Sequence, residues 1–478
     1  MAKADITDHA AGPVNDLLFA KALVFKSGEK LAALITIDAV AIGGIGRIND
    51  KFLPRLRERL QKELKISPEN VLVNASHCHG VVRADLDDLV VKAVTEAHRN
   101  LEAVKAGAGT GREDRIQENR RLILKDGRQA DVRHAYSMPE DKAVASFGPI
   151  DPQIGLLRID RLDGTPLAAV YNFACHPIQG VPSRGNTADF PAFASKVIEE
   201  NLGEGVMAFF LQGCAGDINP VAYKEVRFPR DAESLGNLLG LSALKGLKTI
   251  QTKADAPLRL KNKVLAIPRA TDMEQRIEAI EAEQKKLVGS LRGTTLDLKT
   301  FVPLLVQYKL AEDFPSYYSH RYLKEKADGK EFLSKLDVEN RASLEAYLRN
   351  VRTMEQLTRL NANLDLLKKN LALNRLAGKP HIDAELCLLQ IGGFTLLTFP
   401  GELTVQIGLN LKKASPVQQA FIAGYTNGYY FYLPTAEQRN NSGYAQEDCD
   451  CLVAPQWQKI FETAALEMLR DLQKEAIP

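Results

Sequence analysis

The chain has 478 residues, enough for about three ordinary domains or for one large domain with insertions. Hydrophobic residues make up 45% and charged residues 26%, which excludes a disordered or low-complexity protein. Lys and Arg number 62 against 60 Asp and Glu, a net charge of +2. This near equality of basic and acidic residues argues against nucleic acid and against an anionic membrane surface as partners.

The sequence contains no segment that predicts a membrane span. Its longest apolar runs, 206–211 and 394–399, are far shorter than the roughly 20 residues a spanning helix needs. The first residues, Met-Ala-Lys-Ala-Asp-Ile-Thr, lack the apolar region of a secretory signal. The six cysteines are too irregularly spaced to predict a disulfide framework. The compartment therefore stays open, and a secreted or periplasmic location requires a signal that was removed.

The first part of the chain has the βαβ pattern of an α/β domain. Residues 31–40 and 71–75 are predicted strands, and residues 48–64 and 85–101 carry the apolar spacing of helices. Further strands are predicted at 155–160, 166–175 and 206–211.

The sequence is mostly helical from 269 to 380. Thr271 and Glu274 have the spacing of a capping box that opens a charged helix. Between 343 and 376, apolar residues recur three or four apart, and Gly378 and Pro380 follow. This stripe predicts a helical hairpin that packs on itself or on the main domain, with a helix that forms a homo-oligomer as the alternative.

Strand-like sequence resumes at 384–390, 394–399 and 420–425. Similar sequence thus brackets the helical stretch, which predicts an insertion at 269–380 within one folded unit that spans 1–478. The predicted fold class is α/β: one large mixed-sheet domain with a mainly helical insertion.

Three of the eight histidines follow predicted strands, where α/β sheets place functional loops. His77 and His79 stand two apart after the strand at 71–75, so both side chains point to the same side if the strand continues. Such a pair can bind a metal, although hydrogen-bonded structural histidines are the commoner explanation.

Two further groups carry polar residues at strand ends. His176 closes the strand at 166–175, and Pro177 prevents the strand from continuing. Glu402 follows the strand at 394–399 and opens an amphipathic stretch over 403–411, where a carboxylate also favours a helix dipole. The aromatic residues of 424–434 are candidates either for a site or for the core.

Taken together, two or three imidazoles and a carboxylate form the ligand set of a zinc site that leaves one position for water. The Gly-rich segment 212–220 could present backbone N–H groups to an oxyanion, or could be an ordinary tight turn. Cys214 within it lacks any feature that lowers a thiol pKa, so it is a poor nucleophile. These observations favour a metal-dependent hydrolase.

The order of these motifs resembles the neutral/alkaline, non-lysosomal ceramidase family, in particular its shorter bacterial members. The resemblance runs nearly from end to end, and the set of motifs in this order is fairly specific. Its landmarks are 4–7, 16–24, His77-Cys-His79, Asn119-Arg120-Arg121, 148–152, His176-Pro177, 188–191, 213–220, Pro400-Gly401-Glu402 and Gly443-Tyr444.

The resemblance implies a zinc-dependent amidase with one Zn²⁺ per chain. Its metal ligands would be His77, His176, Glu402 and Tyr432, and either His77 or His79 could be the ligand of that pair. The other imidazole would exchange protons with water and the leaving group. Implied contacts with the substrate or the oxyanion come from His79, Arg120, Tyr444 and the turn at Asn219.

The chain departs from the family pattern at two places. Asn219 stands where ceramidases have a serine with an assigned catalytic role, and Gly80-Val81-Val82 replaces the family's Ser-Gly-Pro. The sequence also ends before the C-terminal β-sandwich of full-length ceramidases. The expected substrate is therefore a small molecule or lipid with an amide or related acyl bond, and ceramide itself stays open.

Two alternatives remain beside the zinc amidase. The same metal site would also suit an esterase or lactonase. Loss of the family serine motivates a second alternative, a catalytically silent protein whose pocket binds a ligand and whose helical insertion binds a partner.

Overall fold

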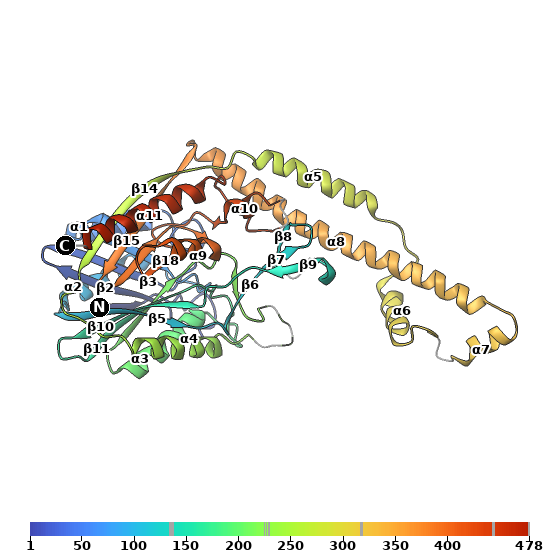
Figure 1. Cartoon of the computed structure of the whole chain (residues 1–478), viewed down its shortest axis with the longest axis horizontal. Helices are drawn as coiled ribbons and strands as arrows, with labels where there is room; N and C mark the ends of the chain where they lie inside the picture. The colour runs from blue at the N-terminus through green and yellow to red at the C-terminus, as the bar shows by residue number, and fades with distance from the viewer. Residues whose placement is uncertain are drawn as a thin grey trace.

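The protein consists of a layered α/β body and a long helical arm (Figure 1). The computed structural model describes residues 1–132, 138–223, 225, 227, 230–315, 319–441 and 445–476. Three four-stranded mixed sheets build the body, and helices cover their outer faces.

The first sheet has the order β1-β2-β3-β4. β1, β2 and β3 pair antiparallel, whereas β3 and β4 are parallel and are joined through α1, the predicted βαβ unit. Helices α1 and α2 contact each other, and α2 packs on β1 and β2. The bounds are β1 Ala2–Asp5, β2 Phe19–Ser27, β3 Lys30–Ile37, α1 Phe52–Leu64, the 3-10 helix η1 Pro68–Asn70, β4 Val71–Ala75 and α2 Leu86–Arg99.

The second sheet has the order β12-β11-β10-β5. Only β11 and β12 are parallel, and α3 connects them. Helix α3 packs on α4, and the two helices cover the sheet. The bounds are β5 Val104–Arg112, β10 Gln153–Arg161, β11 Pro166–Phe173, α3 Asp189–Leu202, β12 Met207–Gln212 and α4 Ala232–Leu247.

The third sheet has the order β14-β15-β16-β18, with β16 and β18 parallel. Helix α9 packs on β18, and α11 packs on β14 and β15. The bounds are β14 Leu258–Pro268, β15 His381–Ile391, β16 Phe394–Thr398, α9 Val405–Ala414, β18 Ala420–Ala423 and α11 Trp457–Ala476.

Short elements complete the body. A three-stranded sheet has the order β8-β7-β9, and two-residue or three-residue strands form the pairs β13-β6 and β17-β19. Their bounds are β6 Gln117–Asn119, β7 Arg121–Leu124, β8 Gln129–Asp131, η2 Asp141–Ala143, β9 Val144–Phe147, β13 Ile218–Pro220, β17 Glu402–Leu403, β19 Tyr432–Leu433 and α10 Ala436–Arg439. No β-sandwich follows within the part of the chain that the structure describes.

The three large sheets share one apolar core. Leu34 of the first sheet, Val170 of the second and Leu389 of the third belong to the same buried cluster. In each sheet the parallel pair ends on the side where a loop with a predicted site residue begins. The mixed α/β fold predicted from the sequence is therefore confirmed, and the strands that were predicted lie within about three residues of their expected bounds, whereas long strands such as β2, β5 and β14 were not predicted.

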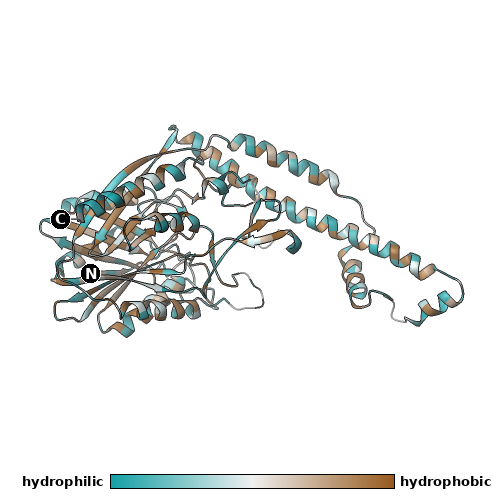
Figure 2. Cartoon of the chain, viewed as in Figure 1, coloured by the Kyte–Doolittle hydropathy of each residue, from teal (hydrophilic) through white to brown (hydrophobic). Residues whose placement is uncertain are grey.

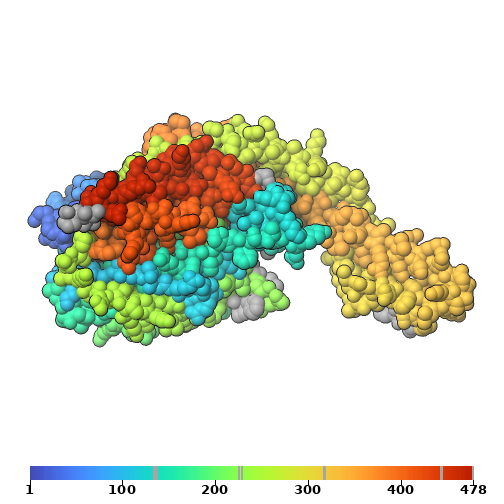
Figure 3. Space-filling view, in the orientation of Figure 1, coloured from blue at the N-terminus to red at the C-terminus, as the bar shows by residue number. Residues whose placement is uncertain are grey.

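The arm consists of four helices between the antiparallel partners β14 and β15, whose last register pair is Pro268 with His381. Helices α5, α6 and α7 all pack on α8, which extends far beyond the body (Figures 1 and 3). The bounds are α5 Met273–Ser290, α6 Leu298–Leu310, α7 His320–Ala327 and α8 Phe332–Leu376. These four helices fall within residues 269–380, the segment that the sequence predicts as an insertion, and the stripe of α8 packs on α5 and α6.

One detail of the arm differs from the prediction. Helix α5 begins after Asp272, and its N-cap makes no side-chain hydrogen bond, so Thr271 and Glu274 do not form a capping box. A capping box occurs instead at α6, between Asp297 and Thr300. None of the described helices combines the length and the hydropathy that a bilayer-spanning segment requires.

Candidate metal centre and active-site cavity

Strand ends from all three sheets meet at one place. The Asn74 amide in β4 donates to Gly424 O at 2.8 Å, and Asn74 Oδ1 accepts from the Gln212 N–H at 3.0 Å. Asn74 therefore joins the ends of β4, β12 and β18 in the buried interior. The loops that follow carry His77, the Gly-rich turn and the aromatic segment.

His77, His176 and Glu402 converge at this junction. His176 Nε2 lies 3.0 Å from Glu402 Oε2, and His77 Nε2 lies 3.6 Å from the same oxygen. One ligand atom of each residue lies within 4.8 Å of the others, and all three residues are buried. This cluster could hold a metal ion.

Hydrogen bonds on the far side of each ring support that conclusion. His77 Nδ1 lies 2.5 Å from Val40 O, and His176 Nδ1 lies 3.0 Å from Ile218 O. A carbonyl only accepts, so each Nδ1 carries the proton and each Nε2 directs a lone pair toward Glu402. Two nitrogen lone pairs facing a carboxylate oxygen repel one another unless a cation lies between them. The donor set therefore fits a divalent metal such as zinc.

Two tyrosines hold Glu402 in place. The Tyr425 hydroxyl donates to Glu402 Oε2 at 3.2 Å, and the Tyr429 hydroxyl donates to Oε1. The backbone of Gly216 lies against Glu402, where a Cβ atom would come within 2.6 Å of Glu402 O. Only glycine permits so close an approach.

Burial and neighbouring groups shift the ionisation of the cluster. Burial lowers the pKa of His77 to about 4 and also lowers the pKa of His176, so both imidazoles are neutral. Burial opposes the charge of Glu402, whereas the hydrogen bond from the Tyr429 hydroxyl lowers the pKa of this carboxyl. Neutral imidazoles beside a carboxylate are the protonation states that metal ligation requires.

The backbone at the site is strained. His77 has φ of 67°, and Tyr425 and Phe431 have φ of 53° and 59°. Non-glycine residues adopt this left-handed region at a cost of about 1–3 kcal/mol each, and such residues cluster at functional sites. Strand β4 ends at Ala75, so the extended segment that would turn His77 and His79 to the same side does not continue.

His79 occupies a different position from His77. Its ring is exposed and lies 5.6 Å from the His77 ring, nearly perpendicular to it. His79 is outside the cluster that could hold a metal but lines the same cavity. Between the two histidines, the structure thus favours His77 as the ligand.

Tyr432 lies next to Glu402, because the two residues are register partners in the parallel pair β17-β19. Its hydroxyl accepts a hydrogen bond from Arg120 Nη2 at 3.1 Å. Tyr432 lines the cavity beside the cluster, and its role as a fourth ligand stays a prediction. Glu402 itself lies in β17, so the predicted position at the start of a helix is wrong; α9 begins only at Val405, after Thr404.

Arg120 is buried next to the cluster and is held from several sides. Its Nη1 donates to Asn219 Oδ1 at 3.1 Å, its Nη2 donates to Gly216 O at 2.5 Å, and its Nε lies 2.7 Å from Glu447 Oε1. The guanidinium also lines the cavity, whereas Asn219 is a buried partner of Arg120 in β13. Glu447 thus compensates the charge of Arg120 within the protein.

The segment 212–220 uses several of its N–H groups inside the fold. Gly213 N donates to Phe173 O, Gly216 N to Leu403 O and Ile218 N to Ala215 O. These three groups are therefore not free to bind an oxyanion. Burial raises the pKa of the Cys214 thiol, which agrees with its rejection as a nucleophile. Tyr444 lies outside the described residues.

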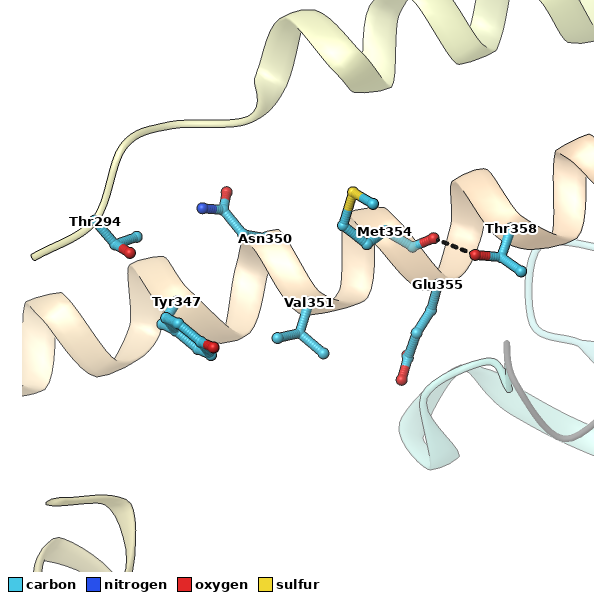
Figure 4. Close-up of a pocket in the computed structure, with 7 residues that line it drawn as sticks. All are labelled: Thr294, Tyr347, Asn350, Val351, Met354, Glu355 and Thr358. Atoms are coloured by element: carbon cyan, nitrogen blue, oxygen red, sulfur yellow. Dashed lines mark hydrogen bonds between the residues drawn. The ribbon is translucent and has the colours of Figure 1, made fainter. Parts of the chain in front are cut away.

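The cluster lies in a cavity of about 1530 Å³. Its lining includes His77, His79, Arg120, His176, Glu402 and Tyr432, and the arm contributes Leu366 and Lys369 of α8. A second pocket of about 500 Å³ is lined mainly by residues of α8 (Figure 4). Only the first of these two pockets contains candidate metal ligands.

Several residues of this site were not singled out by sequence reasoning. Val40 and Ile218 orient the histidines through backbone carbonyls, which no side-chain pattern reveals. Tyr425 and Tyr429 belong to the aromatic segment 424–434, and the density of tyrosines there was the available signal. Glu447 gave no signal in the sequence.

Comparisons with known proteins agree with this geometry at the level of the fold. No family model matches the chain, and a search by sequence finds no match among curated proteins. Among solved structures, "Ceramidase complexed with C2" matches at a TM-score of 0.61 and 15% identity, over 99% of this chain and 75% of that chain. The neutral ceramidase from Pseudomonas aeruginosa matches at a TM-score of 0.59 and 17% identity, over 99% and 74% of the two chains. The protein therefore shares its fold with neutral ceramidases.

Proposed function

We propose that the protein is a zinc-dependent hydrolase that cleaves the amide bond of an N-acyl substrate. The single observation that supports this best is the convergence of His77 Nε2, His176 Nε2 and Glu402 Oε2 in a large cavity of a ceramidase fold. His77, His176 and Glu402 would hold the metal. Tyr432 would be a fourth ligand, supported by its register with Glu402.

The protein supplies a preorganised set of ligands. Val40 O and Ile218 O fix the orientation of both rings, and the Tyr425 and Tyr429 hydroxyls fix the Glu402 carboxylate. When bound, zinc supplies Lewis acidity to a carbonyl and lowers the pKa of water toward neutrality. Because these hydrogen bonds already hold the ligand side chains, metal binding would restrict few further side-chain rotations, which favours tight binding.

Two residues of the cavity wall are placed to act on the substrate. His79 is exposed beside the cluster, and an imidazole can accept a proton from water and return it to a leaving amine. Arg120 presents a fixed positive charge to a developing oxyanion. Asn219 and Glu447 hold that guanidinium and are positioning residues.

The cavity volume supports a substrate larger than a simple amide. A volume of about 1530 Å³ exceeds the roughly 300–1,000 Å³ that enclose ordinary small ligands, so an acyl chain fits beside the reacting group. A ceramide-like N-acyl lipid is one such substrate. Asn219 provides no hydroxyl nucleophile, so attack by water is the proposed route.

Metal analysis of the purified protein tests the first step. We expect about one zinc per chain, and Glu402→Ala and His176→Ala should each lose most of it, because each removes a ligand. Arg120→Ala should keep the metal and lose turnover. His98→Ala, a change in α2 outside the cavity, serves as the control. Less than about a tenth of an equivalent of zinc in the wild type, with no gain after reconstitution, contradicts the proposal.

Activity assays test the second step. The zinc-loaded protein is offered pairs of substrates that share one acyl chain and differ in an amide or an ester linkage. We expect hydrolysis of the amide and its loss in Glu402→Ala. Cleavage of the ester alone would reassign the site to an esterase, and cleavage of neither compound would contradict a hydrolase.

A further inference from the structure

Four basic side chains line the cavity, and they differ in how their charges are compensated. Arg120 lies 2.7 Å from Glu447, and Lys369 lies 3.8 Å from Asp450 and 4.2 Å from the centre of the Phe431 ring. Arg184 and Arg230 are exposed at the cavity wall. No acidic side chain in the described ranges lies within salt-bridge distance of either arginine.

Both arginines belong to the same part of the wall. Arg184 is in the turn that follows Gly180, and its N–H donates to Val181 O at 3.0 Å. Arg230 lies against the same turn, since a Cβ atom on Gly180 would be 3.5 Å from Arg230 Cδ. The Arg230 guanidinium also stacks over the Tyr223 ring at 5.6 Å. The backbone of Arg184 and the side chain of Arg230 thus lie at the same turn.

The acidic residues of the cavity are engaged elsewhere. Asp189 accepts the N–H groups of Gly180 and Phe190, at 2.6 and 2.8 Å. Glu225 pairs with Arg227 at 2.9 Å, and Glu402 belongs to the metal cluster. The wall around residues 180–184 and 230 therefore carries two arginines that form no salt bridge with a described acidic side chain of the cavity.

We infer that Arg184 and Arg230 form a subsite for an anionic group of the substrate. The inference rests on the proposed function and names the substrate class: an N-acyl compound whose amine part carries a carboxylate or another anion, in contrast to the uncharged ceramide. Guanidinium groups bind carboxylates and sulfonates through paired N–H donors, which places the amide at a fixed distance from the anion. The amide then lies toward the metal cluster, and the acyl chain fills the apolar remainder of the cavity.

Three substrates with the same lauroyl chain test the inference in the zinc-loaded full-length protein. N-Lauroylethanolamine is neutral, N-lauroylglycine carries a carboxylate and N-lauroyltaurine carries a sulfonate. We expect a lower KM for at least one anionic compound than for the neutral one, and a smaller advantage at high salt. Equal KM values for all three contradict the inference.

Charge-removing variants identify the residues. In Arg184→Gln/Arg230→Gln we expect KM for the preferred anionic substrate to rise about tenfold, with KM for N-lauroylethanolamine changed less than about twofold. Replacing Arg230 by lysine instead of glutamine should preserve part of the affinity, because lysine keeps the positive charge but lacks the paired N–H donors of the guanidinium. Arg99→Gln, an exposed arginine at the end of α2, is the matched control. An unchanged KM in the double variant overturns the inference.

A binding assay separates this inference from the proposed function. If the protein hydrolyses none of the amides, the proposed function fails, and calorimetric titration with N-lauroylglycine still reports on the subsite. A Kd that rises about tenfold in the double variant, but not in Arg99→Gln, supports the anion subsite without catalysis. Equal Kd values for the wild type and the double variant overturn it.

Discussion

The body and the arm of this protein bury their apolar residues very differently. In the body, strands of three sheets share one core, and large side chains such as Phe399 and Trp457 are fully buried. Among its described residues the arm has two small clusters, one around Leu364 and Leu367 and one around Phe301 and Tyr308. Its helices leave apolar residues in the solvent, among them Leu298, Val302, Val306 and Leu310 of α6 (Figure 2).

The arm itself has two parts that differ in their contacts: a base that packs on the body and a far end that does not. Near the body, Arg359 Nη2 donates to Asp131 O at 2.9 Å, and Asn370 Nδ2 donates to Cys449 O at 3.1 Å. Leu366 and Lys369 in the same part of α8 line the cavity. The base of the arm is thus part of the cavity wall, while α6 and α7 pack on the far part of α8. Stability and function should therefore depend on the base and not on the far end.

The largest expected effect comes from deleting the whole insertion. Replacing 269–380 by Asn-Gly keeps the β14-β15 register but removes the cavity wall and the partners of Asp131 and Cys449. We expect loss of the cooperative thermal transition. Deleting only 293–349 is the control, since Arg292 and Asn350 already contact each other. If both deletions leave Tm unchanged, the base has no structural role.

Replacing one buried aromatic residue in the body and one in the arm should give the next largest difference in stability between the two regions. Phe399 packs on Trp457 and Phe461, so Phe399→Ala should lower the free energy of unfolding of the body by about 3–5 kcal/mol. Phe301 stacks on Tyr347 in the arm, and Phe301→Ala should leave the main transition unchanged while making the arm more sensitive to limited proteolysis. Denaturant titration and protease digestion measure the two effects, and equal shifts of the main transition would show that both regions unfold together.

Substitutions of two arginines in α8 compare the stability contributed by the buried base of the arm with that contributed by its exposed surface. Arg359 is buried against Asp131, and Arg359→Met should cost about 1–3 kcal/mol because it removes a buried hydrogen bond to the Asp131 carbonyl. Arg352 pairs with Glu140 and is half exposed, so Arg352→Met should cost less than about 0.5 kcal/mol. Chemical denaturation of both variants checks the order, and the reverse order would contradict the role of the base.

A further, smaller comparison between body and arm concerns the pH dependence of stability. Burial raises the pKa of Asp38 in the body to about 6. Because the folded protein binds this proton more tightly than the unfolded chain does, the free energy of unfolding falls as pH rises from about 4 through 6. Asp38→Asn should therefore gain about 1–2 kcal/mol relative to the wild type between pH 4 and 8, a figure discounted for partial exposure.

The arm should show the opposite sign. At the N-cap of α6, hydrogen bonds from Thr300 lower the pKa of Asp297. Its contribution to the helix is present above the ordinary carboxyl pKa and is lost as pH falls. Urea titrations of Asp38→Asn at several pH values, with circular dichroism of the arm in parallel, test both signs. A pH-independent difference between wild type and Asp38→Asn would show that Asp38 is already charged in the folded state.

Much of the fold and part of the site could be predicted from the sequence because they depend on local patterns. The strand 71–75 was predicted with its observed bounds, and the apolar stripe of α8 identified the longest helix. His77, His176 and Glu402 could be singled out because each follows a buried strand. Their convergence is a consequence of how parallel strand ends meet.

What could not be predicted depends on tertiary contacts. Glu402 was expected at the start of a helix, but the register with Tyr432 places it in β17. His77 turns away from an extended course because its backbone adopts a positive φ, which no residue type announces. The shared position of Arg184 and Arg230 follows from a close approach at Gly180, between residues about fifty positions apart.

The pairing of Pro268 with His381 has a consequence for how such a protein can diversify. A hairpin whose loop has become a helical arm can gain, lose or exchange that loop while the paired strands keep their register. Leu366 and Lys369 show that the arm also reaches the cavity. Changes in this peripheral segment can therefore reshape the cavity wall while the junction of His77, His176 and Glu402 stays as it is.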